Sequence, residues 1–423
     1  MAEILPFKAV RYDRAVVGDL SKVVSPPYDV ISPEDRIYYH RLHPYNFVRL
    51  ILGQELPEDD KTNNRFTRAT AYLHEWLAQG VLREDPEPAI YAYEQQFQRD
   101  GAVRTIRGIQ CAVRIHDYSD RVILPHENTL AKPRSQLAQL IRATAANLDS
   151  IYGLYADTES VLVPLLEGAA LSEPEVEAFD RDGVRHRLWA VTDSAAIASV
   201  RRFFQDRLIA IADGHHRYET ALAYRDEMRA KHGGSEFLPS DYVLMTLVNV
   251  HQEDMTILPT HRVVGRLSPK RVERLDAALG DLFEVRESTR PAILEDMSSR
   301  DAIGMYRAGR AHTLRPRPGS AELIPGSPAS RKLELNVLHT LILHRILGID
   351  EGRLRNETNI RYTRDAAEAM DLVDSGERQV AFLLNRIDVE SVLHIASAGE
   401  RMPQKATYFY PKLLSGLVLR RMG

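Results

Sequence analysis

The sequence has little cysteine and no long apolar run. Cys111 is the single cysteine among 423 residues, so the chain cannot form an intramolecular disulfide. Such sparing use of cysteine is typical of a reducing, intracellular compartment. No window approaches ~18 uninterrupted apolar residues, and the first residues, MAEILPFKAVRYD, lack the apolar stretch of a signal peptide. We therefore expect a cytoplasmic protein with neither export nor a membrane span.

An excess of charge of one sign is also missing. Lysine and arginine number 55 against 59 acidic residues, which gives a net charge of only -4. Proteins that bind duplex DNA usually have a basic face, because neutralising phosphates supplies most of that affinity. This balance disfavours DNA as a partner. Hydrophobic residues at 44% and charged residues at 27% are an ordinary mixture for a globular chain with a sizeable core.

The length and the distribution of motifs predict two regions. At a prior of ~150 residues per domain, the chain is too long for one domain. We place a boundary where the motif-rich segments stop, which gives an N-terminal region (1–264) that we expect to be catalytic and a C-terminal α/β region (265–423). The last motif, residues 402–413, is expected to return to the site of the N-terminal region. The fold class that we expect is α+β, with mixed sheets and flanking helices.

Start and stop signals place several elements along the chain. Serine followed by proline marks helix starts at Ser32 and Ser268. Asp100 and Gly101 fit a hairpin turn between the strand-like runs 89–97 and 105–115, and the apolar run 241–250 fits a strand covered on both faces. Further helices are expected at 62–80, 333–348 and 363–376, and a surface loop at 315–332. The helix at 333–348 packs either on the core, as we expect, or on a partner subunit.

One polar stretch, IADGHHRYETAL, follows the apolar residues RLIA and leads into a segment with helical spacing. Strand, sharp turn and helix in this order aim backbone N–H groups and the positive end of the helix dipole at an anion. Gly214 lets the backbone approach a ligand closely, and Arg217 offers a planar fork of donors suited to phosphate. Asp213 is expected to cap the helix or to hold a histidine tautomer. The stretch predicts a phosphate-binding turn.

Two adjacent histidines, His215 and His216, lie in this turn. On a helix they diverge by ~100° and cannot both face one ligand atom. We expect one to contact phosphate or transfer a proton, and the other to orient or pack. The alternative is a capped helix with surface imidazoles, since short Asp-Gly turns before helices are common.

The stretch HENTLAKPRSQL mixes candidate bases with phosphate-binding cations. His126 and Glu127 come first, and Lys132 and Arg134 follow within a few residues. Cations of this kind suit phosphate oxygens, and a nearby carboxylate suits a general base. The alternative is a charged loop followed by a helix that starts near Ser135.

Three further polar stretches complete the set. In SPPYDVI, two prolines stiffen the chain before Asp29, which makes a platform for a general base or a magnesium ligand, or else a plain turn. LPTHR contributes His261. In MPQKATYFYPKL, a nucleobase could stack on Tyr408 while Lys405 or Lys412 meets phosphates; the alternative is an edge strand whose lysines extend to solvent.

Six stretches in the same order resemble a bacterial and archaeal family known as DUF 1015. They are PPYDVI, HPYNFVRL, HENTLAKPRSQLAQLIRATAANL, IADGHHRYETAL, LPTHR and MPQKATYFYPKLLSGLV. The resemblance spans nearly the whole chain and is highly specific. The family label assigns no activity.

A second, local resemblance concerns DGHHR, which is similar to the phosphate-binding turn of the ParB/sulfiredoxin superfamily. In that superfamily the turn holds CTP in ParB proteins, ATP in sulfiredoxins and ADP in an archaeal free-serine kinase. By position, the resemblance implies a phosphate cradle of Gly214, His215, His216 and Arg217. His215 stands where sulfiredoxin has its reactive cysteine, which disfavours sulfur chemistry. One helix and a glycine pair lead from the turn to the next strand, with no helix-turn-helix, which disfavours DNA partitioning.

We therefore expect a nucleotide-dependent phosphotransferase that acts on a small hydroxylated metabolite such as serine. The expected cofactors are a nucleotide, ATP or ADP, and Mg2+, which nucleotide phosphates bring with them. The candidate catalytic residues are His215, His216, Asp29 and Glu127. The candidate phosphate and nucleotide ligands are Asp213, Gly214, Arg217, His126, Lys132, Arg134, His261, Lys405, Tyr408 and Lys412.

Three alternatives remain open from the sequence. A phosphomonoester hydrolase, for example one acting on phosphoserine, would need no nucleotide. A metal-dependent hydrolase could use His126, His215, His216, His251 and His261, although no H-E-x-x-H pair or comparable ligand spacing occurs. A nucleotide-sensing regulator would bind without turnover. The sequence also leaves open a homo-oligomer.

Overall fold

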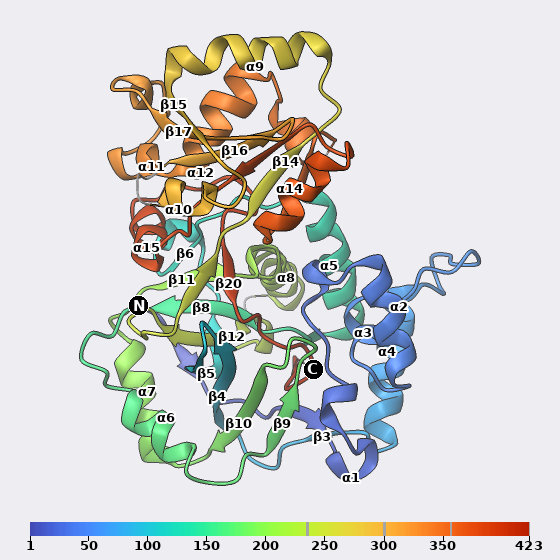
Figure 1. The fold of residues 1–423 in the computed structure, drawn as a ribbon. Coiled ribbons are helices and arrows are strands. Elements are labelled where there is room, and N and C mark those ends of the chain that lie inside the picture. The colour runs from blue at the N-terminus through green and yellow to red at the C-terminus, as the bar shows by residue number, and fades with distance from the viewer. Residues whose placement is uncertain (234–236, 299–301, 356–357, 423) are drawn as a thin grey trace. The chain divides into compact units, whose positions relative to one another are not determined.

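The computed structural model describes residues 1–233, 237–298, 302–355 and 358–422 (Figure 1). The chain forms two compact units. Unit 1 comprises Met1–Pro125, Thr129–Met255 and Pro411–Gly423, and unit 2 comprises His126–Asn128 and Thr256–Tyr410. The long segment of unit 2 thus begins at Thr256, nine residues before the start expected at residue 265. The division into a catalytic and a C-terminal region stays a prediction.

Unit 1 is built on a mixed sheet. Its order is β6-β11-β8-β12-β5-β4-β10-β9, and β1 also pairs with β5. The pairs β6–β11 and β8–β12 are parallel and the others antiparallel, which confirms the predicted mixed α+β class. The strands are β1 (Ile4–Leu5), β4 (Ile90–Arg99), β5 (Ala102–Arg114), β6 (Ile123–Leu124), β8 (Ile151–Tyr155), β9 (Val176–Phe179), β10 (Arg185–Val191), β11 (Ile209–Asp213) and β12 (Tyr242–Asn249). Two small ribbons pair β2 (Val10–Tyr12) with β3 (Leu82–Glu84) and β7 (Ala146–Asn147) with β21 (Arg420–Arg421).

Helices of unit 1 pack on this sheet and on one another (Figure 1). They are α1 (Arg14–Val17), α2 (Pro33–Leu42), α3 (Val48–Ile51), α4 (Arg65–Ala78), α5 (Ala131–Thr144), α6 (Val163–Ala169), α7 (Ser194–Phe204) and α8 (His215–His232). Residues of α6, α7 and α8 share one apolar core with the central strands. Helix α8 also packs along α5, so the helix that follows the polar turn is held from two sides.

Several predicted elements of the chain are confirmed. Helix α2 begins at Pro33, and the Ser32 hydroxyl accepts a hydrogen bond from the Asp35 backbone N–H at 3.0 Å. Asp100 and Gly101 join β4 to β5 with φ angles of 50° and 76°, the two positive values that a type I′ hairpin requires. All eight residues of β12 are buried, as expected for a strand covered on both faces.

The structure excludes one alternative and contradicts one local prediction. Helix α5 begins at Ala131, not near Ser135 as in the charged-loop alternative, because the first turn of a helix tolerates Pro133, whose missing N–H has no intrahelical acceptor there. Residues 315–332 are not a plain loop. They contain a 3₁₀ turn at Ser320–Leu323 and the short helix α11 (Pro328–Lys332), which Ser327 caps by accepting a hydrogen bond from the Ser330 N–H at 3.2 Å.

The C-terminal segment of the chain belongs to unit 1. Lys412 forms an ion pair with Asp213 there, at 3.2 Å. Arg420 is buried and donates hydrogen bonds to the carbonyls of Tyr242 and Pro239 at 2.9 and 2.8 Å. Residues 411–423 therefore complete the unit that the first 255 residues begin.

Unit 2 contains an antiparallel sheet of order β15-β17-β16-β19-β14-β18 and a separate ribbon, β13-β20. Its strands are β13 (Thr256–Leu258), β14 (His261–Val264), β15 (Phe283–Ser288), β16 (Ile303–Arg307), β17 (Arg310–Pro316), β18 (Ile360–Thr363), β19 (Val380–Leu383) and β20 (Tyr408–Tyr410). Its other helices are α9 (Pro269–Leu282), α10 (Ile293–Ser298), α12 (Glu334–Val337), α13 (Glu351–Arg355), α14 (Ala366–Asp374) and α15 (Val389–Ser397). The predicted helix at 333–348 is present, but its second part, Leu338–Ile346, is a π-helix. Within the described ranges, no helix combines the length and apolar character needed to cross a membrane.

Candidate functional site

The polar stretch at 211–222 forms the predicted strand, turn and helix. Gly214 lies between β11 and α8 with φ at 98°, a left-handed conformation that favours glycine. A Cβ atom there would lie 2.9 Å from Nε of Arg217, whose side chain folds back over the turn. No side chain caps the N-terminus of α8. The positive end of the dipole of an 18-residue helix is therefore directed out of this turn.

Asp213 does not cap the helix, so that part of the prediction is wrong. Its carboxylate instead forms ion pairs with Arg217 at 2.9 Å and with Lys412 at 3.2 Å. Arg217 also donates a hydrogen bond to the Ser150 carbonyl. Burial opposes ionisation of Asp213, but Lys412 and Arg217 outweigh it and hold the pKa of this carboxyl well below its usual range. A guanidinium enclosed by protein needs a counter-charge, which Asp213 supplies.

Two further carboxyl groups share this electrostatic environment. Asp29 lies in the short 3₁₀ turn Tyr28–Val30, and Asp149 precedes β8. Solvent reaches Asp29, but the surrounding protein desolvates its carboxyl and, with the Asp213 charge, raises its pKa. Desolvation likewise raises the pKa of Asp149, against the attraction of Arg217. One carboxyl held ionised beside others held closer to neutral is the pattern of an acid–base site.

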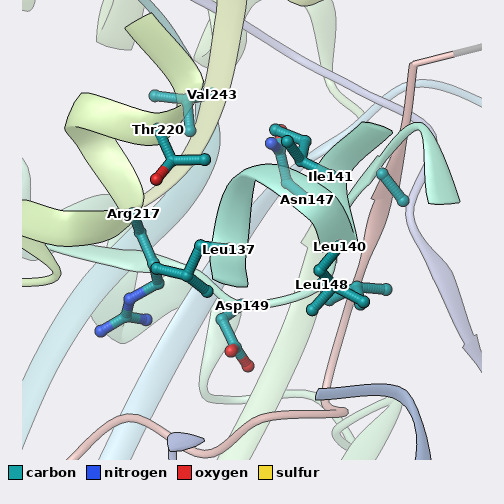
Figure 2. A pocket seen from close by; sticks show the side chains of 10 residues that line it. Leu137, Leu140, Ile141, Asn147, Leu148, Asp149, Arg217, Thr220 and Val243 are labelled. Atoms are coloured by element: carbon teal, nitrogen blue, oxygen red, sulfur yellow. The ribbon is translucent and has the colours of Figure 1, made fainter. Parts of the chain in front are cut away.

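A small cavity of about 50 Å³ lies next to these groups. Figure 2 shows the polar ends of Arg217 and Asp149 directed to the same side of it, with Leu137, Leu140 and Leu148 lining the pocket beside them. Three buried atoms of lining residues have no hydrogen-bond partner among the described residues. They are Nε of Arg217, Oδ1 of Asp149 and Oγ1 of Thr220. Buried polar atoms are rarely left unpaired in native proteins, so these three point to a small polar ligand.

The other predicted residues of unit 1 lie around α5 and α8. His215 is buried, whereas His216 accepts a hydrogen bond from the Leu130 N–H at 2.8 Å. Burial lowers the pKa of His216, which favours the neutral imidazole that this acceptor role requires. Arg134 pairs with Glu219 at 2.9 Å, and Lys132 is exposed in the first turn of α5. His215 and His216 therefore differ in surroundings, as their spacing on a helix predicts.

Three of the predicted residues lie together in unit 2. The buried His126 contacts the Thr407 hydroxyl through Nε2 at 3.0 Å. Glu127 accepts a hydrogen bond from the backbone N–H of Lys405 at 3.2 Å. The Lys405 ammonium lies 4.7 Å from the centre of the Tyr362 ring. Their roles as base and phosphate ligands stay predictions.

His261 and Tyr408 also belong to unit 2. His261 is buried in β14 and accepts a hydrogen bond from the Leu384 N–H through Nδ1 at 3.2 Å. Burial, with the nearby Arg262 charge, lowers the pKa of His261 to about 4. The Arg364 guanidinium lies 4.1 Å from the centre of the Tyr408 ring, where we predicted that a nucleobase stacks.

The low pKa of His261 predicts a loss of stability in acid. The unfolded chain, with a histidine pKa near 6.5, takes up a proton that the folded state refuses until about pH 4. The free energy of unfolding should thus fall by about 2–3 kcal/mol as the pH drops from about 6.5 towards 4. Urea unfolding at both pH values should show a smaller fall in His261→Asn, whose amide oxygen can still accept from Leu384. An equal fall in both proteins would contradict the prediction.

Sequence reasoning missed Asp149 and Thr220. Asp149 belongs to no motif, and its only signal is that the polar pair Asp149-Ser150 directly precedes the apolar strand IYGLY. Thr220 falls on the buried side of α8, where spacing alone predicts core. Both were identifiable only once β8 and α8 were placed side by side.

The histidines considered for a metal site are divided between the units. His126 and His261 belong to unit 2, and His215, His216 and His251 to unit 1. Across the described part of the chain, no group of three or more histidine, cysteine, aspartate or glutamate side chains is arranged to hold a metal ion.

Comparison with known proteins identifies the family. A family model described as a protein of unknown function, DUF1015, matches residues 4–338. The chain belongs to the DUF1015 family. No curated protein matches this DUF1015 chain.

Solved structures similar to this DUF1015 chain include three of note. A free serine kinase in complex with AMP has 14% identity and a TM-score of 0.36, covering 71% of this chain and 86% of its own. A conserved hypothetical protein from Pyrococcus furiosus has 14% identity and a TM-score of 0.37, covering 74% and 95%. C-terminally truncated SbnI from Staphylococcus aureus has 12% identity and a TM-score of 0.37, covering 73% and 86%. Function is therefore argued from this chain's own site.

Proposed function

We propose that unit 1 is a nucleotide-dependent phosphotransferase whose acceptor is a small hydroxylated metabolite such as serine. The observation that carries the proposal is the small cavity with three unpartnered polar atoms beside the Gly214 turn. Phosphoryl transfer depends mostly on positioning and electrostatic stabilisation, for which this arrangement offers a small acceptor pocket with a few polar atoms and an anion-binding turn.

The cavity suits a small zwitterionic acceptor. At ~10–15 Å³ for each water molecule, its volume of about 50 Å³ has room for a few water-sized groups. Oδ1 of Asp149 can accept a hydrogen bond from an ammonium group, and Nε of Arg217 can donate one to a carboxylate. Oγ1 of Thr220 can do either. An amino acid with a hydroxyl group carries a group complementary to each of the three atoms.

The nucleotide, ATP or ADP, would place its phosphates at the Gly214 turn. The backbone N–H groups at the start of α8 and the helix dipole favour an anion there. Arg217 and Lys412 supply positive charge nearby, although Asp213 neutralises part of it. Lys132, exposed in the first turn of α5, remains a candidate for the outer phosphates.

Asp29 is the best candidate for the base that accepts the proton of the acceptor hydroxyl. Its pKa is raised by desolvation and by Asp213, which brings it closer to the operating pH. Glu127, the other candidate base, belongs to unit 2 and hydrogen-bonds to Lys405. Asp213, kept ionised by two cations, holds Arg217 and Lys412 in position instead.

Magnesium is proposed as a companion of the nucleotide. A magnesium ion bound to nucleotide phosphates needs only one or two protein carboxylates, and it supplies positive charge to the transferred phosphoryl group. Asp29 and Asp149 are the carboxylates near the turn that could contribute, and the described residues offer no larger ligand group. Asp29 could not bind magnesium and act as the base at the same time. Likewise, Asp149 could not bind magnesium and the ammonium group of the acceptor together.

The assay that tests the proposal uses purified full-length chain with Mg2+. The protein is incubated with ATP or ADP and with serine, and phosphoserine is measured; a parallel reaction contains phosphoserine without nucleotide. We expect phosphoserine to form only with nucleotide. Release of phosphate from phosphoserine alone would overturn the kinase assignment in favour of a phosphatase. Nucleotide binding without turnover for any hydroxylated acceptor would favour a regulator.

A further inference from the structure

Unit 2 contains a second cavity, whose volume is much larger than that of the small cavity in unit 1. Its volume is about 910 Å³, near the upper end of the ~300–1,000 Å³ usual for small-molecule sites. Every residue that lines it belongs to unit 2. The function proposed for unit 1 makes no use of it.

Cations dominate the charged groups of this cavity. Its arginine and lysine side chains are Arg262, Arg315, Arg331, Lys332 and Arg386, and its carboxylates are Glu334 and Asp388. Both carboxylates already serve local structure. Glu334 accepts a hydrogen bond from the Asn385 N–H at 2.8 Å, and Asp388 caps α15 by accepting from the Ser391 N–H at 2.7 Å. The five cations line the cavity without a matching set of acids.

Two of these arginines have donors left over. Nε of Arg331 is buried and has no hydrogen-bond partner among the described residues. The same holds for Nε of Arg262, whose side chain is fully buried. Arg262 donates to the carbonyls of Thr260 and Lys405, and no ion pair of its guanidinium occurs within the described ranges. A buried guanidinium with only carbonyl acceptors is a costly arrangement that an anion would relieve.

The protonated form of Arg262 is correspondingly destabilised. Burial lowers the pKa of its guanidinium to about 10. The charges of Tyr362 and Glu127 act in the opposite direction and raise this pKa. His339, in the π-helical segment Leu338–Ile346, lies within electrostatic range, and its pKa is lowered to about 3 by burial and by Arg262. A second positive charge on His339 is thus disfavoured. π-Helical segments occur frequently at functional sites.

Part of the remaining wall of the cavity is apolar. Leu335, Val337 and Leu384 line it and are buried. A wall of this kind suits an uncharged organic body, and guanidinium groups suit the paired oxygens of phosphate. The two kinds of surface occur in one cavity of nucleotide size.

We infer that the cavity of unit 2 binds an organic phosphate, with its phosphate groups on the arginines and its uncharged body on the apolar wall. No residue of unit 1 lines this cavity, and the cavity holds a ligand of its own. Together with the site proposed for unit 1, it would give the chain two phosphate-binding sites, one in each unit.

Calorimetric titration of the full chain with AMP tests the inference, and the variants assign the sites. Arg386→Gln changes an exposed cation of the cavity, and Arg331→Gln changes the half-buried one. We expect each to weaken AMP binding at the unit 2 site by about tenfold or more, as for a lost charge-assisted hydrogen bond. Arg310→Gln, on the same strand as Arg315 but outside the cavity, is the matched control and should bind as the unchanged chain does.

The proposed site of unit 1 is tested separately in the same titration. Lys412→Met removes a cation of the Gly214 turn and should weaken only the event that belongs to unit 1. If Lys412→Met has no effect while Arg386→Gln still weakens binding, the function proposed for unit 1 fails and this inference stands. The inference for unit 2 is overturned if both Arg386→Gln and Arg331→Gln bind AMP unchanged. It is also overturned if the unchanged chain binds no AMP up to millimolar concentration. Inorganic phosphate that binds as tightly as AMP overturns the assignment of an organic body.

Discussion

Replacing Asp29 with asparagine is expected to lower the turnover of phosphotransfer by about 10²–10⁴-fold, the usual contribution of a general base. Asparagine keeps the shape of the side chain but cannot accept the proton of the acceptor hydroxyl. The affinity for nucleotide should stay unchanged, because the phosphates are assigned to the Gly214 turn. Steady-state kinetics with ATP and serine, together with nucleotide titration, measure both quantities.

Glu127→Gln is the matched comparison for Asp29→Asn. Glu127 was the other candidate base in the sequence, and it lies in unit 2. We expect Glu127→Gln to keep most of the turnover. A large loss in Glu127→Gln with none in Asp29→Asn would reassign the base. If neither substitution changes the turnover or the nucleotide affinity, the result favours a nucleotide-sensing regulator over an enzyme.

Replacing Asp213 with asparagine should destabilise unit 1 by about 3–5 kcal/mol, because it leaves enclosed positive charge without its partner. Asp213 is the counter-ion of both Arg217 and Lys412, whose side chains are only 9% and 11% exposed. Asp213 stabilises the fold only while its carboxyl is ionised, so its contribution depends on pH. Its pKa is lower in the folded than in the unfolded state, so this contribution exists at neutral pH and is lost as the pH falls below the unfolded value of about 4.

Thermal unfolding followed by circular dichroism measures the effect of Asp213→Asn at neutral pH. Glu227→Gln is the control, because its ion pair with Arg142 has a similar length of 2.7 Å but is 45% and 51% exposed. An exposed pair contributes about 1 kcal/mol or less, so this variant should unfold close to the unchanged protein. Equal unfolding temperatures for the two variants would show that the pairs of Asp213 do not hold the turn.

Much of the local structure could be predicted from sequence because its causes are local. The left-handed pair Asp100-Gly101 specifies its hairpin, and the serine-proline starts specify α2 and α9. The turn at Gly214 was predictable for the same reason, since strand, glycine and helix follow one another. Near Pro133 the local signal left two solutions open, and helix α5 begins at Ala131, four residues before the start given in the charged-loop alternative.

The composition of the site could not be predicted in full, because it depends on contacts between distant segments. Arg217 looked free to bind phosphate, but its burial requires a counter-charge, which Asp213 provides. Asp149 joins the cluster only because β11 lies beside β8 in the sheet order. That order is not sequential, and hydrophobic periodicity carries no information on it. His126, Glu127, Lys405 and Tyr408 carry suggestive chemistry, but the chain places them in a different compact unit from Asp29 and Gly214.

The interrupted course of unit 1 along the chain has a consequence for its biosynthesis. A ribosome synthesises residues 256–410 before it makes the segment that carries Lys412 and Arg420. At ~5–20 residues per second, the first part of unit 1 waits for about ten seconds or longer with Asp213 lacking one of its cations. Until that segment is made, unit 1 is incomplete, and this incomplete unit 1 is the species that chaperones would have to protect.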